Sequence, residues 1–132
     1  MNVASNDEFL AKPTWNPADV ALDPRVGMTG LGTVAAYVGR KAAYTNMRST
    51  FGYAMKDPQG VVRYYAADAN GNPDTSREIP GAKSFRLLFN VGTVVAGSLL
   101  IGQARDANLD YLGLGAAAGG AANVLMTLVG ID

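Results

Sequence analysis

Two long stretches without a charged residue occupy the C-terminal third of the chain. Residues 87–104 and residues 111–131 carry no charge, and a short polar break, residues 105–110, separates them. As helices that rise 1.5 Å per residue, these stretches would be about 27 and 32 Å long, which matches a bilayer hydrocarbon core of about 30 Å. The pattern predicts a transmembrane-like helical hairpin over residues 85–132, held in a bilayer or in an equally apolar protein interior.

Small residues recur four positions apart within both stretches. In lipid, helices associate by close backbone approach across such small-residue faces. In water, each glycine would cost about 1 kcal/mol relative to alanine in a helix interior. We therefore predict tight helix packing, in a membrane or in a crowded multi-subunit core, at Gly92, Ala96, Gly97, Gly113, Ala117, Gly119 and Gly120.

The region before the hairpin combines a basic and an apolar character. Residues 25–49 include four basic residues and no acidic one. The uncharged part of this region, residues 26–39, is too short to span a bilayer, which takes about 20 residues. Leu31, Val34 and Val38 recur at helical spacing, which predicts an amphipathic helix from about Gly30 to Arg48. Two readings stay open: an interfacial helix that contacts anionic headgroups, or an ordinary amphipathic helix packed on a small core. The candidate headgroup or partner contacts are Trp15, Arg40, Lys41 and Arg48.

Residues 50–84 contain the only segment with a β pattern. Two runs rich in tyrosine and valine, residues 51–56 and 61–66, flank Asp57-Pro58-Gln59-Gly60. Proline second and glycine fourth suit a type I turn, so the pattern predicts a β-hairpin. A dense cluster of turn residues, 68–74, is expected to end its second strand.

Residues 1–24 form a polar, acidic arm interrupted by proline. Asn16 followed by Pro17 is typical of a helix start. The favoured reading of residues 1–24 as a whole is an extended arm that lies on a partner's surface, and short helices are the alternative. The first residues include neither a basic nor an apolar run, so we expect no cleaved signal peptide.

The residue inventory excludes most catalytic chemistry. The chain has no Cys and no His, and its formal net charge is zero. Thiol nucleophiles, Ser-His-Asp triads and most zinc sites are therefore excluded, and sequence-specific nucleic-acid binding is not expected. Asp68, Asn70, Asn72 and Asp74 alternate like calcium ligands, but proline stands where an EF-hand requires glycine. We expect no cofactor, no metal site and no enzymatic activity.

The expected fold class is mainly α: a hydrophobic helical hairpin preceded by an amphipathic helix and a small β-hairpin. We expect a structural membrane protein, a small subunit that binds the lipid bilayer, copies of itself and other subunits. Candidate assemblies are a membrane-containing virion, a DNA-delivery apparatus or a membrane complex with accessory subunits, in a virion membrane or a host inner membrane. Basic residues precede the first apolar stretch, so the positive-inside rule would place both termini on one side and only residues 105–110 on the other. The competing hypothesis is a soluble coat or tail protein whose hairpin is buried in an oligomeric core.

Overall fold

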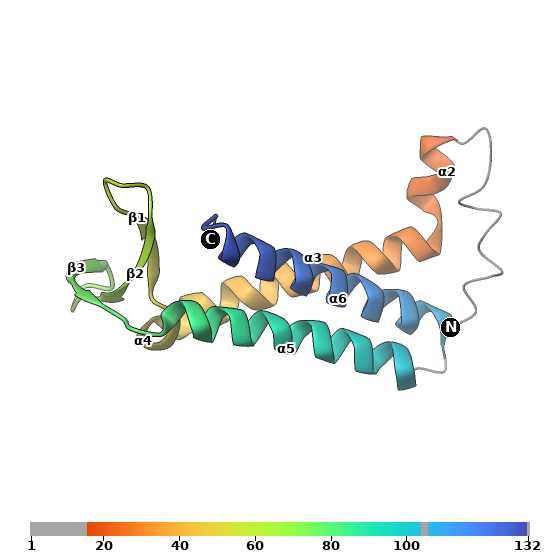
Figure 1. The fold of residues 1–132 in the computed structure, drawn as a ribbon. Coiled ribbons are helices and arrows are strands. Elements are labelled where there is room, and N and C mark those ends of the chain that lie inside the picture. The colour runs from red at the N-terminus through yellow and green to blue at the C-terminus, as the bar shows by residue number, and fades with distance from the viewer. Residues whose placement is uncertain (1–15, 104–105, 132) are drawn as a thin grey trace.

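The computed structural model describes residues 16–103 and 106–131. Three long helices, α3 (Pro24–Asn46), α5 (Ala82–Gln103) and α6 (Ala107–Leu128), lie side by side, and a small sheet stands at one end of them (Figure 1). The fold is mainly helical, and its C-terminal third is a pair of long apolar helices in a hairpin-like arrangement, as the sequence predicted.

Helix α6 is the central helix of this bundle. It packs extensively against both α3 and α5, whereas α3 and α5 contact each other little. Along α3, Thr29 lies against Gly115 and Thr33 against Gly119, so α3 and α6 run in the same direction. Along α5 the order is reversed, and the two C-terminal helices are antiparallel (Figure 1).

Helix α3 is longer than the helix expected from about Gly30 to Arg48. It begins at Pro24, because Asp23 caps it by accepting a hydrogen bond from the Arg25 amide at 2.8 Å and proline fits the first helical position. It ends at Asn46, and Arg48 belongs to a separate short helix, α4 (Arg48–Phe51). Helix α3 packs along α6, and both readings of this segment, an interfacial helix or a helix packed on a small core, stay predictions.

The N-terminal part of the described chain contains one short helix, α2 (Pro17–Leu22). It starts where the Asn16-Pro17 pair predicted, and the Asn16 side chain accepts a hydrogen bond from the Ala18 amide at 2.9 Å. The rest of the expected arm, including Trp15, lies outside the described residues.

The predicted β-hairpin is present as β1 (Tyr53–Lys56) and β2 (Val62–Ala67). The strands pair antiparallel, with Tyr53 opposite Tyr65, and the Gly60 amide donates to the Asp57 carbonyl at 2.9 Å to close the turn. Gly52 joins α4 to β1 with a φ of 69°, a left-handed conformation that favours glycine.

A third strand, β3 (Pro73–Glu78), extends the hairpin to a sheet of order β1-β2-β3. The residues after the second strand were expected to form only turns and a loop. The strand lacks the alternation of apolar and polar residues because it is an exposed edge strand, which also explains why it tolerates Pro73 at its start.

Both helices of the hairpin begin earlier than their uncharged stretches. Helix α5 starts at Ala82, which places Arg86 inside the helix and 98% buried. Helix α6 starts at Ala107 after a cap by Asp106, so Asp110 lies in its first turn with only 4% of its surface exposed. The expectation that Asp110 belongs to an exposed connecting loop was therefore wrong.

Candidate functional site

Glycine allows α6 to approach both neighbouring helices at backbone distance. A Cβ added to Gly115 would lie 1.8 Å from the Thr29 carbonyl oxygen of α3, and one added to Gly97 would lie 2.5 Å from the Gly113 carbonyl oxygen of α6. Real Cβ atoms do not come so close to backbone, so these positions admit only glycine without a shift of the helices. This is the close packing that small-residue faces give in lipid.

Five of the seven expected packing positions lie at these contacts. Gly119 faces Ala36 and Thr33 of α3, whereas Gly120 faces Val94 of α5. Gly113 and Ala117 lie against Gly97. Gly115, which stands four residues before Gly119 and was expected with it to form a small-residue face, and Gly32 make the closest approaches of all, and Gly32 was not among the expected positions.

Gly92 and Ala96 lie elsewhere than expected. Both are exposed, and a Cβ on Gly92 would meet no other atom within 4 Å. They line an open groove of about 560 Å³ between α3 and α5, opposite Gly32, Ala35 and Gly39. Their small side chains therefore make room on the surface of the bundle and do not join α5 to α6.

Polar side chains occupy the interior of the bundle. Asn90, Asn123 and Thr127 have no exposed surface. Asn90 donates hydrogen bonds to the Tyr44 hydroxyl at 2.8 Å and to the Arg86 carbonyl at 2.9 Å, which ties α5 to α3. Asn123 reaches the Ala36 carbonyl at 3.4 Å, and Thr127 bonds to the Asn123 carbonyl at 3.1 Å.

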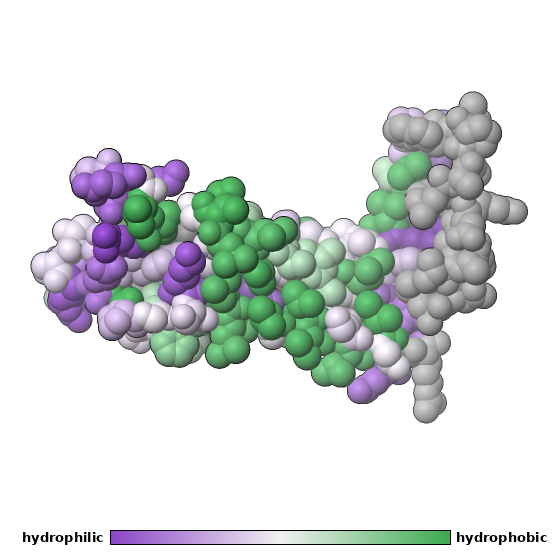
Figure 2. All heavy atoms as spheres, viewed as in Figure 1, coloured by the Kyte–Doolittle hydropathy of each residue, from purple (hydrophilic) through white to green (hydrophobic). Residues whose placement is uncertain are grey.

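Large apolar side chains point outward from all three helices. In the most apolar 18-residue window of α5 only 17% of the residues are buried, and in that of α6 only 33%. Both helices are long and apolar enough to cross a membrane. On the face shown in Figure 2, apolar surface covers the middle of the bundle and polar surface lies over the sheet at one end, and this apolar surface is called the apolar belt below. The exposed residues on the helices include Leu31, Val34, Val38, Leu88, Val91, Val95, Leu99, Leu114, Leu125 and Leu128.

A basic pocket lies at the end of the bundle next to the sheet, and the term is used below for this cavity. Its volume is about 710 Å³, and α3, α4, β1, α5 and α6 all contribute to it. Three expected contact residues, Arg40, Lys41 and Arg48, line the pocket together with Arg86. No acidic side chain is among its lining residues within the described parts of the chain.

Arg86 is the buried member of this group. Its burial was not predicted from the sequence, in which Arg86 was read only as a basic residue that precedes an apolar stretch. Its Nε donates to the Phe51 carbonyl at 2.8 Å and a terminal nitrogen donates to the Gly52 carbonyl at 2.9 Å. The guanidinium stacks 4.1 Å from the Tyr44 ring centroid and 4.6 Å from that of Tyr64. These contacts hold the turn between α4 and β1 against α5. A signal was present, since Ala82, Arg86 and Asn90 are spaced by four residues and share one helix face.

Arg48 and Arg40 are held at the pocket walls by weaker contacts. The Arg48 guanidinium stacks 4.1 Å from the Tyr53 ring centroid and donates one hydrogen bond to the Gly52 carbonyl at 3.0 Å. Its Nε is buried and has no hydrogen-bond partner among the described residues. Arg40 lies 5.9 Å from the Tyr37 ring centroid and 4.0 Å from the Met126 sulfur. Lys41 is exposed.

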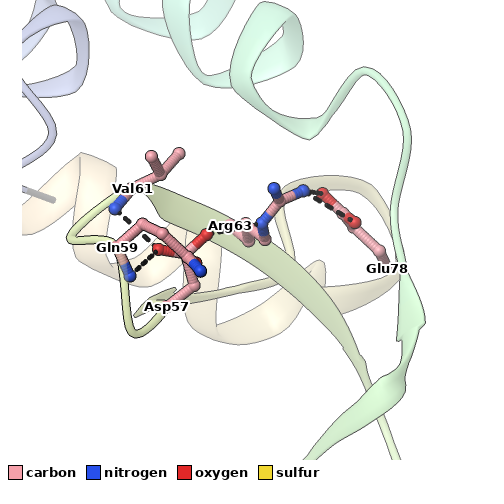
Figure 3. Close-up of polar contacts among 5 residues, drawn as sticks. All are labelled: Asp57, Gln59, Val61, Arg63 and Glu78. Atoms are coloured by element: carbon pink, nitrogen blue, oxygen red, sulfur yellow. Dashed lines mark hydrogen bonds and ion pairs between the residues drawn. The ribbon is translucent and has the colours of Figure 1, made fainter.

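The acidic side chains of the sheet are used in turns and ion pairs. Asp57 accepts hydrogen bonds from the Gln59 and Val61 amides and from Arg63 Nε, each at 2.9 Å, and Arg63 also reaches Glu78 (Figure 3). The Arg63 guanidinium and the Val61 amide lower the pKa of Asp57. Asp68 accepts from two backbone amides in its own turn, and the described residues bring no three His, Cys, Asp or Glu side chains together around a metal site.

Comparison with protein-family models, with curated proteins and with solved structures finds no match to this chain.

Proposed function

We propose that this chain is a non-enzymatic structural membrane protein whose three long helices form the lipid-embedded unit of a larger assembly. The observation that carries the proposal is the reversed distribution of polarity in the bundle. Asn90, Asn123 and Thr127 are fully buried, whereas Leu88, at 69%, and Leu125, at 62%, are largely exposed. In water such exposure forfeits about 1.5 to 3 kcal/mol for each large apolar side chain, whereas in lipid it costs nothing.

The packing of α3 suggests that three helices, and not two, cross the bilayer. Helix α3 accompanies α6 along its length and exposes Leu31, Val34 and Val38 on its outer face. Its uncharged part is short, but Arg25 at one end and Arg40 and Lys41 at the other are long enough to extend their charges toward the headgroups.

Three crossings change the orientation expected from the sequence. Figure 1 places α2 and the C-terminal end of α6 at opposite ends of the bundle. In a membrane, α2 and the start of α6 would then share one side, and the sheet and the end of α6 would share the other. The expectation that both termini lie on the same side does not fit this arrangement.

The role supported by this arrangement is architectural. The apolar belt would anchor the bundle in lipid, and the exposed polar sheet would remain accessible to a protein partner outside it. Whether the assembly is a membrane-containing virion, a DNA-delivery apparatus or another membrane complex stays a prediction from the overall character of the sequence.

A soluble coat or tail protein is the second candidate, because an oligomeric core would also cover exposed leucine and valine. Alkaline carbonate extraction of membranes from expressing cells separates the two hypotheses. A membrane-spanning chain stays in the pellet, and a soluble subunit or one attached only at the surface moves to the supernatant.

A pair of matched variants links the result to the apolar belt. Val95→Lys with Leu99→Lys places two charges on the belt, at a cost of about 2.5 to 3.5 kcal/mol each at the centre of a helix, and is expected to abolish carbonate resistance. Gln59→Lys with Thr75→Lys adds the same charge to the exposed sheet and is expected to leave the chain in the pellet. Release of the unaltered chain by carbonate would refute the proposal.

A further inference from the structure

Four basic side chains line the basic pocket, and the lining residues within the described parts of the chain include no acidic side chain. Arg40, Lys41, Arg48 and Arg86 line one cavity of about 710 Å³, a volume within the range of small-ligand sites. Lys41 and Arg48 place two positive charges in this cavity, and both would attract an anion placed between them. The composition of the pocket therefore favours an anionic ligand.

The donors in the pocket are suited to oxygen atoms of a phosphate group. The planar guanidinium of Arg48 is oriented by its stacking on Tyr53, and its buried Nε has no acceptor among the described residues. Arginine donates in a fixed fork that matches phosphate oxygens, and lysine adds a mobile point charge. Lys41 is exposed on the neighbouring helix α3 and reaches the same cavity. Arg48 Nε and the Lys41 ammonium are therefore two donors in one cavity that suit phosphate oxygens.

The position of the pocket indicates the source of this phosphate. The pocket is lined by residues of the three long helices and of α4 and β1, so it lies where the bundle meets the sheet, which is the level of the headgroups if the bundle spans a bilayer. Val38 and Met126 provide apolar lining, and Tyr37 and Tyr53 provide aromatic rings of the kind enriched at membrane interfaces. Leu125, which precedes the lining residue Met126 in the sequence, exposes 62% of its surface and would contact acyl chains.

We propose that the basic pocket binds the phosphate group of an anionic glycerophospholipid, with Lys41 and Arg48 as its principal contacts. This inference rests on the proposed membrane function for the lipid source, whereas the phosphate chemistry is independent of it. Bound lipid would fix the helix ends to the sheet, since the pocket is built from both.

Native mass spectrometry of the full chain in mild detergent tests the proposal by titration with phosphatidylglycerol and, separately, phosphatidylcholine. We expect saturable binding of one phosphatidylglycerol molecule and weaker binding of phosphatidylcholine. The double variant Lys41→Gln with Arg48→Gln is expected to weaken phosphatidylglycerol binding by about tenfold or more, as expected for the loss of hydrogen bonds to charged groups. Equal binding of the two lipids would overturn the proposal.

A matched double variant separates the pocket from general electrostatic attraction. Lys83→Gln with Arg77→Gln removes the same two charges from exposed positions that do not line the pocket. We expect this control to retain most of the affinity, and an equal loss in both double variants would contradict a defined site. Because Arg48 also bonds to the Gly52 carbonyl, Lys41→Gln alone provides a variant that leaves the packed contacts of the fold unchanged.

Two further measurements distinguish a lipid phosphate from a free phosphate, and the pocket proposal from the proposed membrane function. Displacement of phosphatidylglycerol by millimolar inorganic phosphate would assign the pocket to a free phosphate and overturn the lipid assignment. Carbonate resistance of the unaltered chain, measured in parallel, reports on membrane insertion alone. A chain that resists carbonate but does not discriminate between the lipids refutes only the pocket proposal, and a chain released by carbonate refutes the membrane function.

Discussion

The contact between Gly115 and Thr29 gives the sharpest test of how the bundle is held together. A Cβ at position 115 would stand 1.8 Å from the Thr29 carbonyl oxygen, against a usual C···O contact of about 3.3 Å. In the variant Gly115→Ala, α3 must therefore move away from α6 by about 1.5 Å. The side chain added is the smallest possible, so the effect reports on backbone approach and not on bulk.

The size of the effect follows from what this displacement removes. A gap of 0.5 to 1 Å already forfeits a quarter to a half of the dispersion energy between facing atoms, and overpacking a tight interface costs about 1 to 3 kcal/mol. The displaced helix also loses the hydrogen bond from the Thr33 hydroxyl to the Gly115 carbonyl, now 3.0 Å long. This loss offsets part of the gain of up to about 1 kcal/mol that alanine brings to a helix interior. We expect a net destabilisation of about 1 to 3 kcal/mol.

Gly92 provides the matched control, because a Cβ there meets nothing within 4 Å. Gly92→Ala gains the same helix propensity without a clash, so it is expected to be neutral or stabilising by up to about 1 kcal/mol. Both variants are unfolded in mixed micelles by titration with dodecyl sulfate, and tyrosine near-ultraviolet circular dichroism follows the loss of packing. Equal stability of Gly115→Ala and Gly92→Ala would refute the account of backbone contact between α3 and α6.

Three further predictions concern the interior, the sheet and the topology. A double-mutant cycle of Asn90→Ala with Tyr44→Phe is expected to show a coupling of about 0.6 to 1 kcal/mol in micelles, the range of interhelical hydrogen bonds; additivity would contradict the bond between α5 and α3. The pKa of Asp57 in the folded chain lies below its ordinary value of 3.8. The contribution of the ionised Asp57 carboxylate to the stability of the turn is therefore complete above pH 3.8 and is lost as the pH falls through the lower folded pKa. The protection of amides in the β1–β2 turn, measured relative to their intrinsic exchange rate at each pH, should therefore fall only below about pH 3.8 and lose this acid dependence in Asp57→Asn. Because the chain has no cysteine, Ala18→Cys and Ser76→Cys can each be labelled with an impermeant maleimide in sealed vesicles, and we expect the two sites on opposite sides; labelling from the same side would contradict a third crossing.

The sequence was sufficient to predict the hairpin because uncharged length and small-residue spacing are local signals. Residues such as Gly97 and Gly120 could be assigned to packing faces without knowledge of the partner helix. The distinction between α5–α6 contacts and the open groove at Gly92 was not predictable, since it depends on how the helices are rotated about their axes. Gly32 escaped notice because its partner, the Leu112 carbonyl oxygen, lies far away in the sequence.

The basic pocket was predictable only in part. Arg40, Lys41 and Arg48 were recognisable as a basic group near one helix end, but their convergence with Arg86 depends on the turn at Gly52 that brings α4 against α5. Arg86 precedes an uncharged stretch, and this position favours reading it as a charge that flanks the helix. In the structure, backbone carbonyl groups accept its hydrogen bonds and two aromatic rings stack on its guanidinium, and these contacts allow it to be buried. Strand β3 was missed because an exposed edge strand has no apolar pattern to reveal it.

The proposed membrane function requires that the exposed leucine and valine side chains of the bundle face lipid. Single spin labels at position 99 of α5 and position 125 of α6, in the reconstituted chain, measure collision with oxygen, which concentrates in lipid, and with a water-soluble nickel complex. Leu99 and Leu125 expose 56% and 62% of their surface, so we expect high oxygen and low nickel accessibility at both. High nickel accessibility, or low accessibility to both reagents as in a protein-covered core, would contradict the claim.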